Sequence, residues 1–281
     1  MDLVFSQERG DALTPPQVQV DLGALNRVNI DPASSTYGFT IASTATAPAT
    51  PVIFPLSPAT RNAVMSDTSF ARYNGAVNGL TFEAARLLPG ASNPLFALDY
   101  TSYADLLVSR AGGERQRYLT ALGLPSSTTV IPAGTATYTG IVLGYGDAYY
   151  HPDQDLTYGT YSILGTATFT LSAATSTGQA FQGNFLLQVT VLSGQFASRT
   201  TRGLTVRFAN AAGAPANGSV QEPTSIAFPG TGSAKGQFFG PNAEEFAATF
   251  SFRTGPAGEL SSSGLSIYTK YAGVILLRRA N

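Results

Sequence analysis

One segment of the chain gathers residue types that could bind a ligand. Residues 144–153 contain Tyr145, Tyr149, Tyr150 and His151, and His151 is the only histidine in the sequence. Tyrosine and histidine both ligate haem iron, and tyrosine is common at the centre of protein–protein interfaces. The segment therefore indicates a site for haem or for a partner protein. The same residues fit a second interpretation, a loop whose aromatic side chains pack on the mouth of a β-barrel.

Two further tyrosines are alternative ligands. Tyr100 and Tyr103 lie close together in the first half of the chain. They too fit either ligation or plain packing, because aromatic side chains supply much of the buried area of a core.

Groups for catalysis are scarce. The chain has no cysteine, and one histidine leaves one possible base for a Ser-His-Asp arrangement, with no Gly-x-Ser-x-Gly motif beside it. A P-loop, a His-Glu-x-x-His helix and a Cys/His zinc pattern are also missing. Glu244 and Glu245 are adjacent carboxylates, but neighbouring strand residues occupy opposite faces, so a solvated turn edge is the better interpretation. We expect no catalytic residues, no metal site and no enzymatic activity.

Composition excludes several classes of protein. Of 281 residues only 12% are charged, about half the usual share of roughly 25%, and the net charge is −1. No broad electrostatic footprint for nucleic acid is present. No apolar run approaches about 18 residues, so no membrane-spanning helix is expected, and residues 1–5 do not read as a signal peptide.

Period-two alternation dominates from Ala133 onward and predicts β-strands. Eight runs follow one another, at residues 135–143, 166–171, 185–191, 204–208, 225–228, 236–239, 246–253 and 265–277. Eight strands suit an antiparallel barrel, which hides its edges by closing, with a sandwich as the second architecture. Residues 240–242, Gly-Pro-Asn, predict the turn of a hairpin, with Pro241 fixing φ and Asn242 tolerating the left-handed region.

The first half of the chain has a weaker β pattern. Residues 52–56 predict a proline-bounded edge strand, and the Asn-Gly pair at 78–79 predicts a small hairpin. Residues 95–103 favour a strand that leads into a helical or irregular element at 104–110, with a helical turn or two at 115–122. The chain is therefore predicted to be mainly β, with a β-rich domain at 1–130 and an eight-stranded β-barrel at 131–281.

Several of these motifs resemble the transferrin-binding protein B family of bacterial surface proteins. The Phe-Phe-Gly-Pro-Asn-Ala-Glu string at 238–244 is similar to that family's barrel signature, with Phe239 where tyrosine is usual. Residues 132–140 and 165–169 resemble its first two barrel strands. Residues 98–103 resemble the segment before the barrel, although Ala104 and Leu106 replace the usual glycine and tryptophan. The resemblance covers residues 132–281 and only this short segment of the first half.

The resemblance implies an eight-stranded barrel beside a "handle" domain, in a surface lipoprotein or secreted protein of Gram-negative bacteria. It implies partners among host iron or haem carrier proteins or small-molecule ligands, with a TonB-dependent outer-membrane receptor as a further partner. Haem is the one cofactor it suggests. The family's lipid-anchor cysteine has no counterpart in this chain. The expected function is non-enzymatic binding for nutrient acquisition, at the bacterial cell surface (outer membrane) or after secretion; the alternative is a structural or adhesive surface protein.

Overall fold

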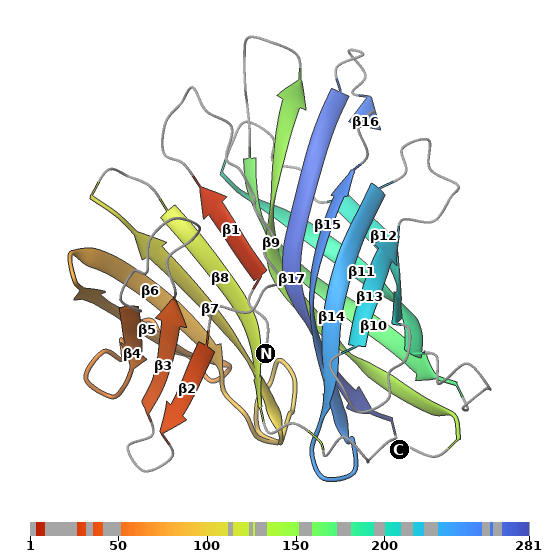
Figure 1. Cartoon of the computed structure of the whole chain (residues 1–281), viewed down its shortest axis with the longest axis horizontal. Helices are drawn as coiled ribbons and strands as arrows, with labels where there is room; N and C mark the ends of the chain where they lie inside the picture. The colour runs from red at the N-terminus through yellow and green to blue at the C-terminus, as the bar shows by residue number, and fades with distance from the viewer. Residues whose placement is uncertain are drawn as a thin grey trace. The chain divides into compact units, whose positions relative to one another are not determined.

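All regular structure among the described residues is β-strand. The computed structural model describes residues 4–8, 27–31, 36–41, 52–111, 115–123, 126, 134–151, 159–172, 181–193, 200–208, 216–221, 230–254, 259–260 and 266–280. By internal contacts the chain divides into two compact units, Met1–Leu122 and Gly123–Asn281. Figure 1 shows the strands of both units, each of which is considered by itself. Together they confirm the prediction of a mainly β protein with a barrel in its C-terminal half.

The first unit contains two antiparallel sheets. A five-stranded sheet has the order β1-β8-β7-β6-β5, and a three-stranded sheet has the order β2-β3-β4. The strands are β1 (Val4–Glu8), β2 (Arg27–Asp31), β3 (Thr36–Ile41), β4 (Val52–Leu56), β5 (Phe70–Val77), β6 (Leu80–Leu87), β7 (Thr101–Ser109) and β8 (Arg115–Gly123). β4 is an edge strand and β5–β6 is a hairpin around Asn78-Gly79, as the sequence predicts.

One strand of the smaller sheet joins the core of the larger one. Phe54 and Leu56 of β4 are buried in a cluster with residues of β5, β6, β7 and β8. The ring of Phe54 meets that of Phe82 edge-on, with 5.5 Å between centroids. This apolar contact holds the two sheets of the unit together, because each sheet would otherwise expose one apolar face.

Two helical predictions in this unit are wrong. Residues 104–110 belong almost entirely to β7, and residues 115–122 form β8. Both faces of β7 are largely buried, so Leu106, Leu107 and Val108 form a continuous apolar run. Such a run has no period of two, and its spacing therefore resembles that of a helix.

The second unit is a closed antiparallel barrel. Its strands are β9 (Ala136–His151), β10 (Gly159–Leu171), β11 (Phe181–Ser193), β12 (Thr200–Phe208), β13 (Ala216–Gln221), β14 (Gly230–Phe239), β15 (Glu245–Thr254) and β17 (Ser266–Arg279), with the two-residue β16 (Glu259–Leu260) beside β17. Each strand from β9 to β15 pairs with the next, β15 pairs with β17, and β17 pairs with β9. Eight strands thus form a complete circuit, as predicted.

One strand of the circuit was not among the predicted runs. The circuit is completed by β13 at Ala216–Gln221, which pairs with β12 and β14. The run at 225–228, which the alternation favours, lies outside the described residues. The sequence of β13, Ala-Asn-Gly-Ser-Val-Gln, has one large apolar residue, so it carries no alternation signal.

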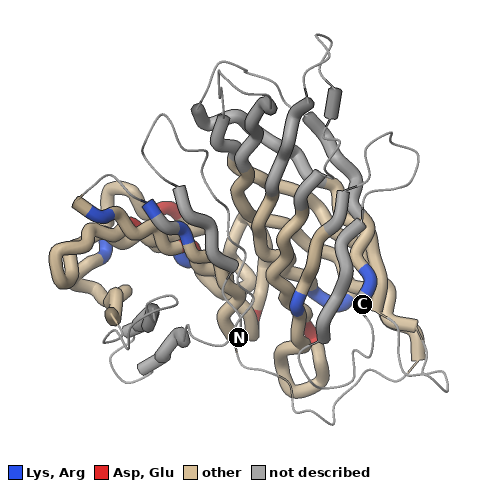
Figure 2. Tube along the Cα trace, turned by 45° about the horizontal axis from the view of Figure 1, so that its top comes forward, with Lys and Arg blue, Asp and Glu red and all other residues tan. Residues whose placement is uncertain are grey.

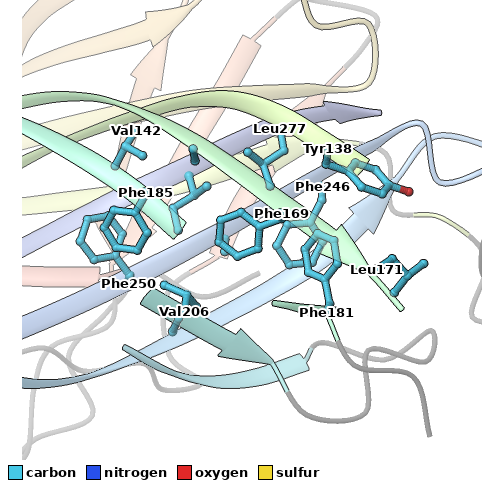
Figure 3. Packing of buried hydrophobic residues seen from close by; sticks show 14 of the residues in the cluster. Tyr138, Val142, Phe169, Leu171, Phe181, Phe185, Val206, Phe246, Phe250 and Leu277 are labelled. Carbon is cyan, nitrogen blue, oxygen red and sulfur yellow. The ribbon is translucent and has the colours of Figure 1, made fainter. Parts of the chain in front are cut away.

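Aromatic side chains fill one end of the barrel, which we call the turn end because it carries residues 240–244. Figure 3 shows Phe169, Phe181 and Phe246 together, beside Tyr138. The centroids of Phe181 and Phe246 lie 4.4 Å apart. The ring of Phe246 lies over Gly236 of the neighbouring strand β14, because a Cβ at that position would collide with the ring. Glycine thus makes room for a large ring in the barrel interior.

The signature turn also closes the turn end. Its left-handed residues are Gly240 (φ 85°) and Ala243 (φ 55°), and not Asn242 as the sequence predicts. Asn242 instead donates its backbone N–H and side-chain amide to the carboxylate of Glu244, at 2.9 and 2.8 Å. The Tyr138 hydroxyl donates to the carbonyl of Ala243 at 2.7 Å. Ser126 donates its backbone N–H to the carbonyl of Phe238 at 2.9 Å, and its hydroxyl to that of Gly240.

The two glutamates after the turn have different environments. Burial raises the pKa of Glu244, but the hydrogen bonds from Asn242 and the charge of Arg279 outweigh it and hold this pKa below its ordinary value. Glu245 is fully buried, so the predicted solvated edge is wrong for that residue. Its Cα partner on β17 is Arg278, which places a cationic residue directly opposite. Both carboxylates therefore belong to the scaffold.

We predict that Tyr138→Phe destabilises the barrel by about 1–3 kcal/mol at pH 7, because the carbonyl of Ala243 loses its buried donor. Burial raises the pKa of Tyr138 to about 12 from 10.0. The unfolded chain loses this proton near pH 10 and the folded chain does not, so the stability that Tyr138 contributes falls as pH rises from 10 through 12.

Urea unfolding of both proteins between pH 8 and 11 checks this. The difference in free energy of unfolding between wild type and Tyr138→Phe should be largest at pH 8 and smaller at pH 11. If the two proteins are equally stable, or if the difference is the same at all these pH values, the account is wrong.

Candidate functional site

Two strands of the barrel continue past their neighbours. β9 and β17 pair from Tyr138–Arg279 to His151–Ser266. β10 stops pairing with β9 at Ala148, and β15 stops pairing with β17 at Lys270. Residues 149–151 and 266–269 therefore form a two-stranded extension, with β16 beside its tip; we call this extension the ribbon (Figure 1). It lies at the opposite end of β9 from the turn end, and we call that end the ribbon end.

The ribbon contains the segment singled out in the sequence. The expectation of a loop at 144–153 is wrong for residues up to His151, which belong to β9. Gly144-Tyr145-Gly146-Asp147 is typical of a turn by composition. Pairing with β17 overrides that preference, because each residue from Gly144 to His151 has a cross-strand partner.

The strand register places the three candidate ligands of this segment on two different faces of the sheet. The pairing of β9 runs without a shift, so its residues alternate strictly between faces. Tyr138 and Val142 belong to the buried interior cluster, and Tyr150 shares their face. Tyr149 and His151 occupy the outer face. These two are thus neighbours on one surface, roughly 7 Å apart along the strand, and Tyr150 lies on the other.

The partner strand brings further residues to the same outer face. Tyr268 is the Cα partner of Tyr149, and Lys270 is the partner of Asp147. Each of these pairs therefore occupies directly opposite positions of the two strands. Sequence reasoning missed both Tyr268 and Lys270, because only the strand pairing reveals which distant residues share a face. Tyr149, His151 and Tyr268 thus share the outer face of the ribbon, and the Asp147–Lys270 pair lies next to it on the same face.

Tyr100 and Tyr103, the candidate ligands of the first unit, lie in and next to the five-stranded sheet. Tyr103 lies in β7, is 4% exposed and meets the ring of Phe70 edge-on, with 6.5 Å between centroids. The Arg72 guanidinium lies over the ring of Phe70, 5.7 Å from its centroid. Tyr103 is therefore a packing residue of the sheet. Tyr100 precedes β7 and is half-buried.

The charged groups of the described residues were compared with the needs of a metal centre. Among the described residues no three of the histidines, aspartates and glutamates lie close enough to hold an ion together. Figure 2 shows how sparse charge is along the described strands of the barrel. None of the described residues forms a helix long and apolar enough to cross a membrane.

Comparison with solved structures gives a distant likeness. No protein-family model matches the chain, and no curated protein matches it by sequence. Among solved structures it is similar to the crystal structure of the isotype 1 transferrin binding protein B from serogroup B Neisseria meningitidis, with 13% identity and a TM-score of 0.35. The match covers 99% of this chain and 44% of that one, so the chain spans less than half of that protein's length.

The ribbon register can be tested with an engineered disulfide, since the chain has no cysteine of its own. We predict that the pair Tyr149→Cys with Tyr268→Cys oxidises to one intramolecular cross-link, because these residues are directly opposite on one face.

The matched control is Tyr150→Cys with Tyr268→Cys, which places the two thiols on opposite faces. Mass spectrometry after mild oxidation measures the cross-linked fraction of both proteins. Equal cross-linking of the two pairs would mean that the register, and with it the shared outer face, is wrong.

Proposed function

We propose that the protein is a non-enzymatic binding protein for nutrient acquisition and that the outer face of the ribbon is its binding surface. One observation supports this above others. The ribbon extends past both of its neighbours and places Tyr149, His151 and Tyr268 on one face. The turn end of the barrel interior is instead filled by packed rings. In the resembling family, binding rather than catalysis is the role of such scaffolds.

Haem, free or delivered by a carrier protein, is the ligand that these residue types suit best. A phenolate or an imidazole can ligate its iron, and the second tyrosine of the face can stack on the porphyrin. A host iron-carrier protein is the other ligand of this class, because tyrosines anchor protein interfaces. The proposal includes a cell-surface or secreted location, where a protein that captures host haem or a host carrier protein would meet its ligand.

Haemin titration tests the proposal. We expect a shifted Soret band with the wild-type chain. We expect His151→Ala or Tyr149→Phe to weaken haemin binding about tenfold or more, the loss that follows when a ligand bond worth over 1.4 kcal/mol is removed. Tyr150→Phe is the matched control, because that residue lies on the opposite face, and it should bind as the wild type does.

An unchanged Soret band would exclude haem. A second experiment then uses purified host iron-carrier and haem-carrier proteins. Their binding to the immobilised wild type is compared with their binding to the immobilised Tyr149→Ala/Tyr268→Ala variant. The proposal fails if no carrier binds, or if the variant retains full affinity.

A structural or adhesive surface role is the second candidate, and one observation favours it. In the first unit, Val64 and Met65 are 95% and 57% exposed. Their loop is well held: the Asn62 side chain accepts the Met65 N–H at 3.1 Å, and the Asn62 N–H donates to the carbonyl of Arg72 at 2.8 Å. A fixed loop that presents two apolar side chains suits contact with another macromolecule.

A further inference from the structure

Asparagine is followed directly by glycine at three places in the chain, residues 74–75, 78–79 and 217–218. Such a pair is prone to lose the side-chain amide of the asparagine, because glycine has no side chain to shield its backbone nitrogen from the neighbouring carbonyl carbon. The reaction also requires the peptide between the two residues to rotate. The three pairs have different backbone settings, so the fold decides which of them reacts.

The pair at 78–79 is the two-residue turn of the β5–β6 hairpin (Figure 1). Asn78 and Gly79 have φ values of 51° and 77°, so both lie in the left-handed region, as in a type I′ turn. Both are exposed, and a Cβ on Gly79 would meet nothing within 4 Å. The strands close at Val77 and Leu80, which leaves the N–H of Gly79 outside the ladder. The peptide between Asn78 and Gly79 can therefore rotate without breaking the strand pairing.

The pair at 74–75 also has an exposed asparagine, but it lies inside β5. Asn74 donates its backbone N–H to the carbonyl of Thr60 at 3.0 Å, on the edge of β5 that faces away from β6. Successive N–H groups alternate in direction along a strand, so the N–H of Gly75 points to its partner Phe82 on β6. The ring of Phe82 also lies against Gly75, because a Cβ there would be 2.8 Å from it. Attack by the nitrogen of Gly75 therefore requires the ladder to open first.

The pair at 217–218 is held on both sides. Gly218 is the Cα partner of Phe208 on β12 and of Ala234 on β14, so it lies inside the barrel sheet and not at an edge. Rotation of the peptide before it would break the pairing of β13.

We propose that Asn78 is a site of spontaneous deamidation and that Asn74 and Asn217 are protected from it. The backbone nitrogen of Gly79 loses its proton and attacks the side-chain carbonyl carbon of Asn78. The new C–N bond closes a succinimide ring, and the side-chain amide takes up a proton and leaves as ammonia. Water then adds to one of the two ring carbonyls and opens the ring. The product is aspartate or isoaspartate at position 78, and the reaction needs neither an oxidant nor an enzyme.

The two products have different effects on the hairpin. Aspartate before glycine also favours a type I′ turn, so the aspartate form keeps the fold. Isoaspartate adds a methylene to the main chain, so the turn no longer matches the closing pair Val77 and Leu80. Both of these side chains pack against the core of the first unit, which isoaspartate therefore disturbs. Either product adds one negative charge to a chain whose net charge is −1.

Peptide mapping of the full chain after storage at mildly alkaline pH tests the proposal. Trypsin cleaves after Arg72 and Arg86 and releases residues 73–86 as one peptide, which contains both Asn74 and Asn78. We expect Asn78 to deamidate about tenfold faster than Asn74 or more, because the reaction at Asn74 must wait for a local opening of the ladder. In the free peptide 73–86, which has no ladder, the two asparagines should react at similar rates. An isoaspartate-specific methyltransferase should label the stored chain at position 78.

The matched control is Asn78→Gly, because Gly-Gly also favours a type I′ turn and carries no side-chain amide. On isoelectric focusing, this variant should form acidic species far more slowly than the wild type. The proposal is overturned if Asn74 and Asn78 react equally fast in the folded chain, if Asn78 stays intact there while the free peptide reacts, or if the variant acidifies as fast as the wild type. The comparison within residues 73–86 uses the wild type alone, so it stands even if Asn78→Gly fails to fold.

Discussion

The barrel depends on how closely three strands approach where it closes. β17 lies between β15 and β9, and without it the sheet would have two open edges. At this seam the backbones meet at glycine. A Cβ on Gly140 would overlap the carbonyl of Leu276, one on Gly144 would overlap that of Ala272, and one on Gly273 would strike the ring of Phe250. Glycine is required here because no side chain fits between the strands.

This closure explains why the two ends of the barrel differ. At the turn end the rings of Phe181, Phe238 and Phe246 pack against one another, and Tyr138 is hydrogen-bonded to the signature turn. The motif that most resembles a known family therefore belongs to the scaffold. At the ribbon end the same closing strand continues with β9 after β10 and β15 have stopped pairing, and the proposed binding surface lies there.

The sequence predicts the barrel because Phe246, Ala248, Phe250 and Phe252 and similar runs alternate clearly. It does not reveal β13, whose residues are small and polar, and it suggests a helix at β7, where both faces are buried. Tyr149 and His151 stand out by residue type. Their neighbours Tyr268 and Lys270 do not, because about 120 residues separate the two strands and only hydrogen-bond register joins them.

Hydrogen exchange with and without haemin tests the central claim, that the ribbon binds and the rest of the barrel is scaffold. The account predicts that haemin slows amide exchange in residues 147–151 and 266–270, and that residues 236–250 and 272–277 are well protected already and do not change. Slower exchange confined to residues 236–250 or to the first unit, with the ribbon unaffected, would contradict it.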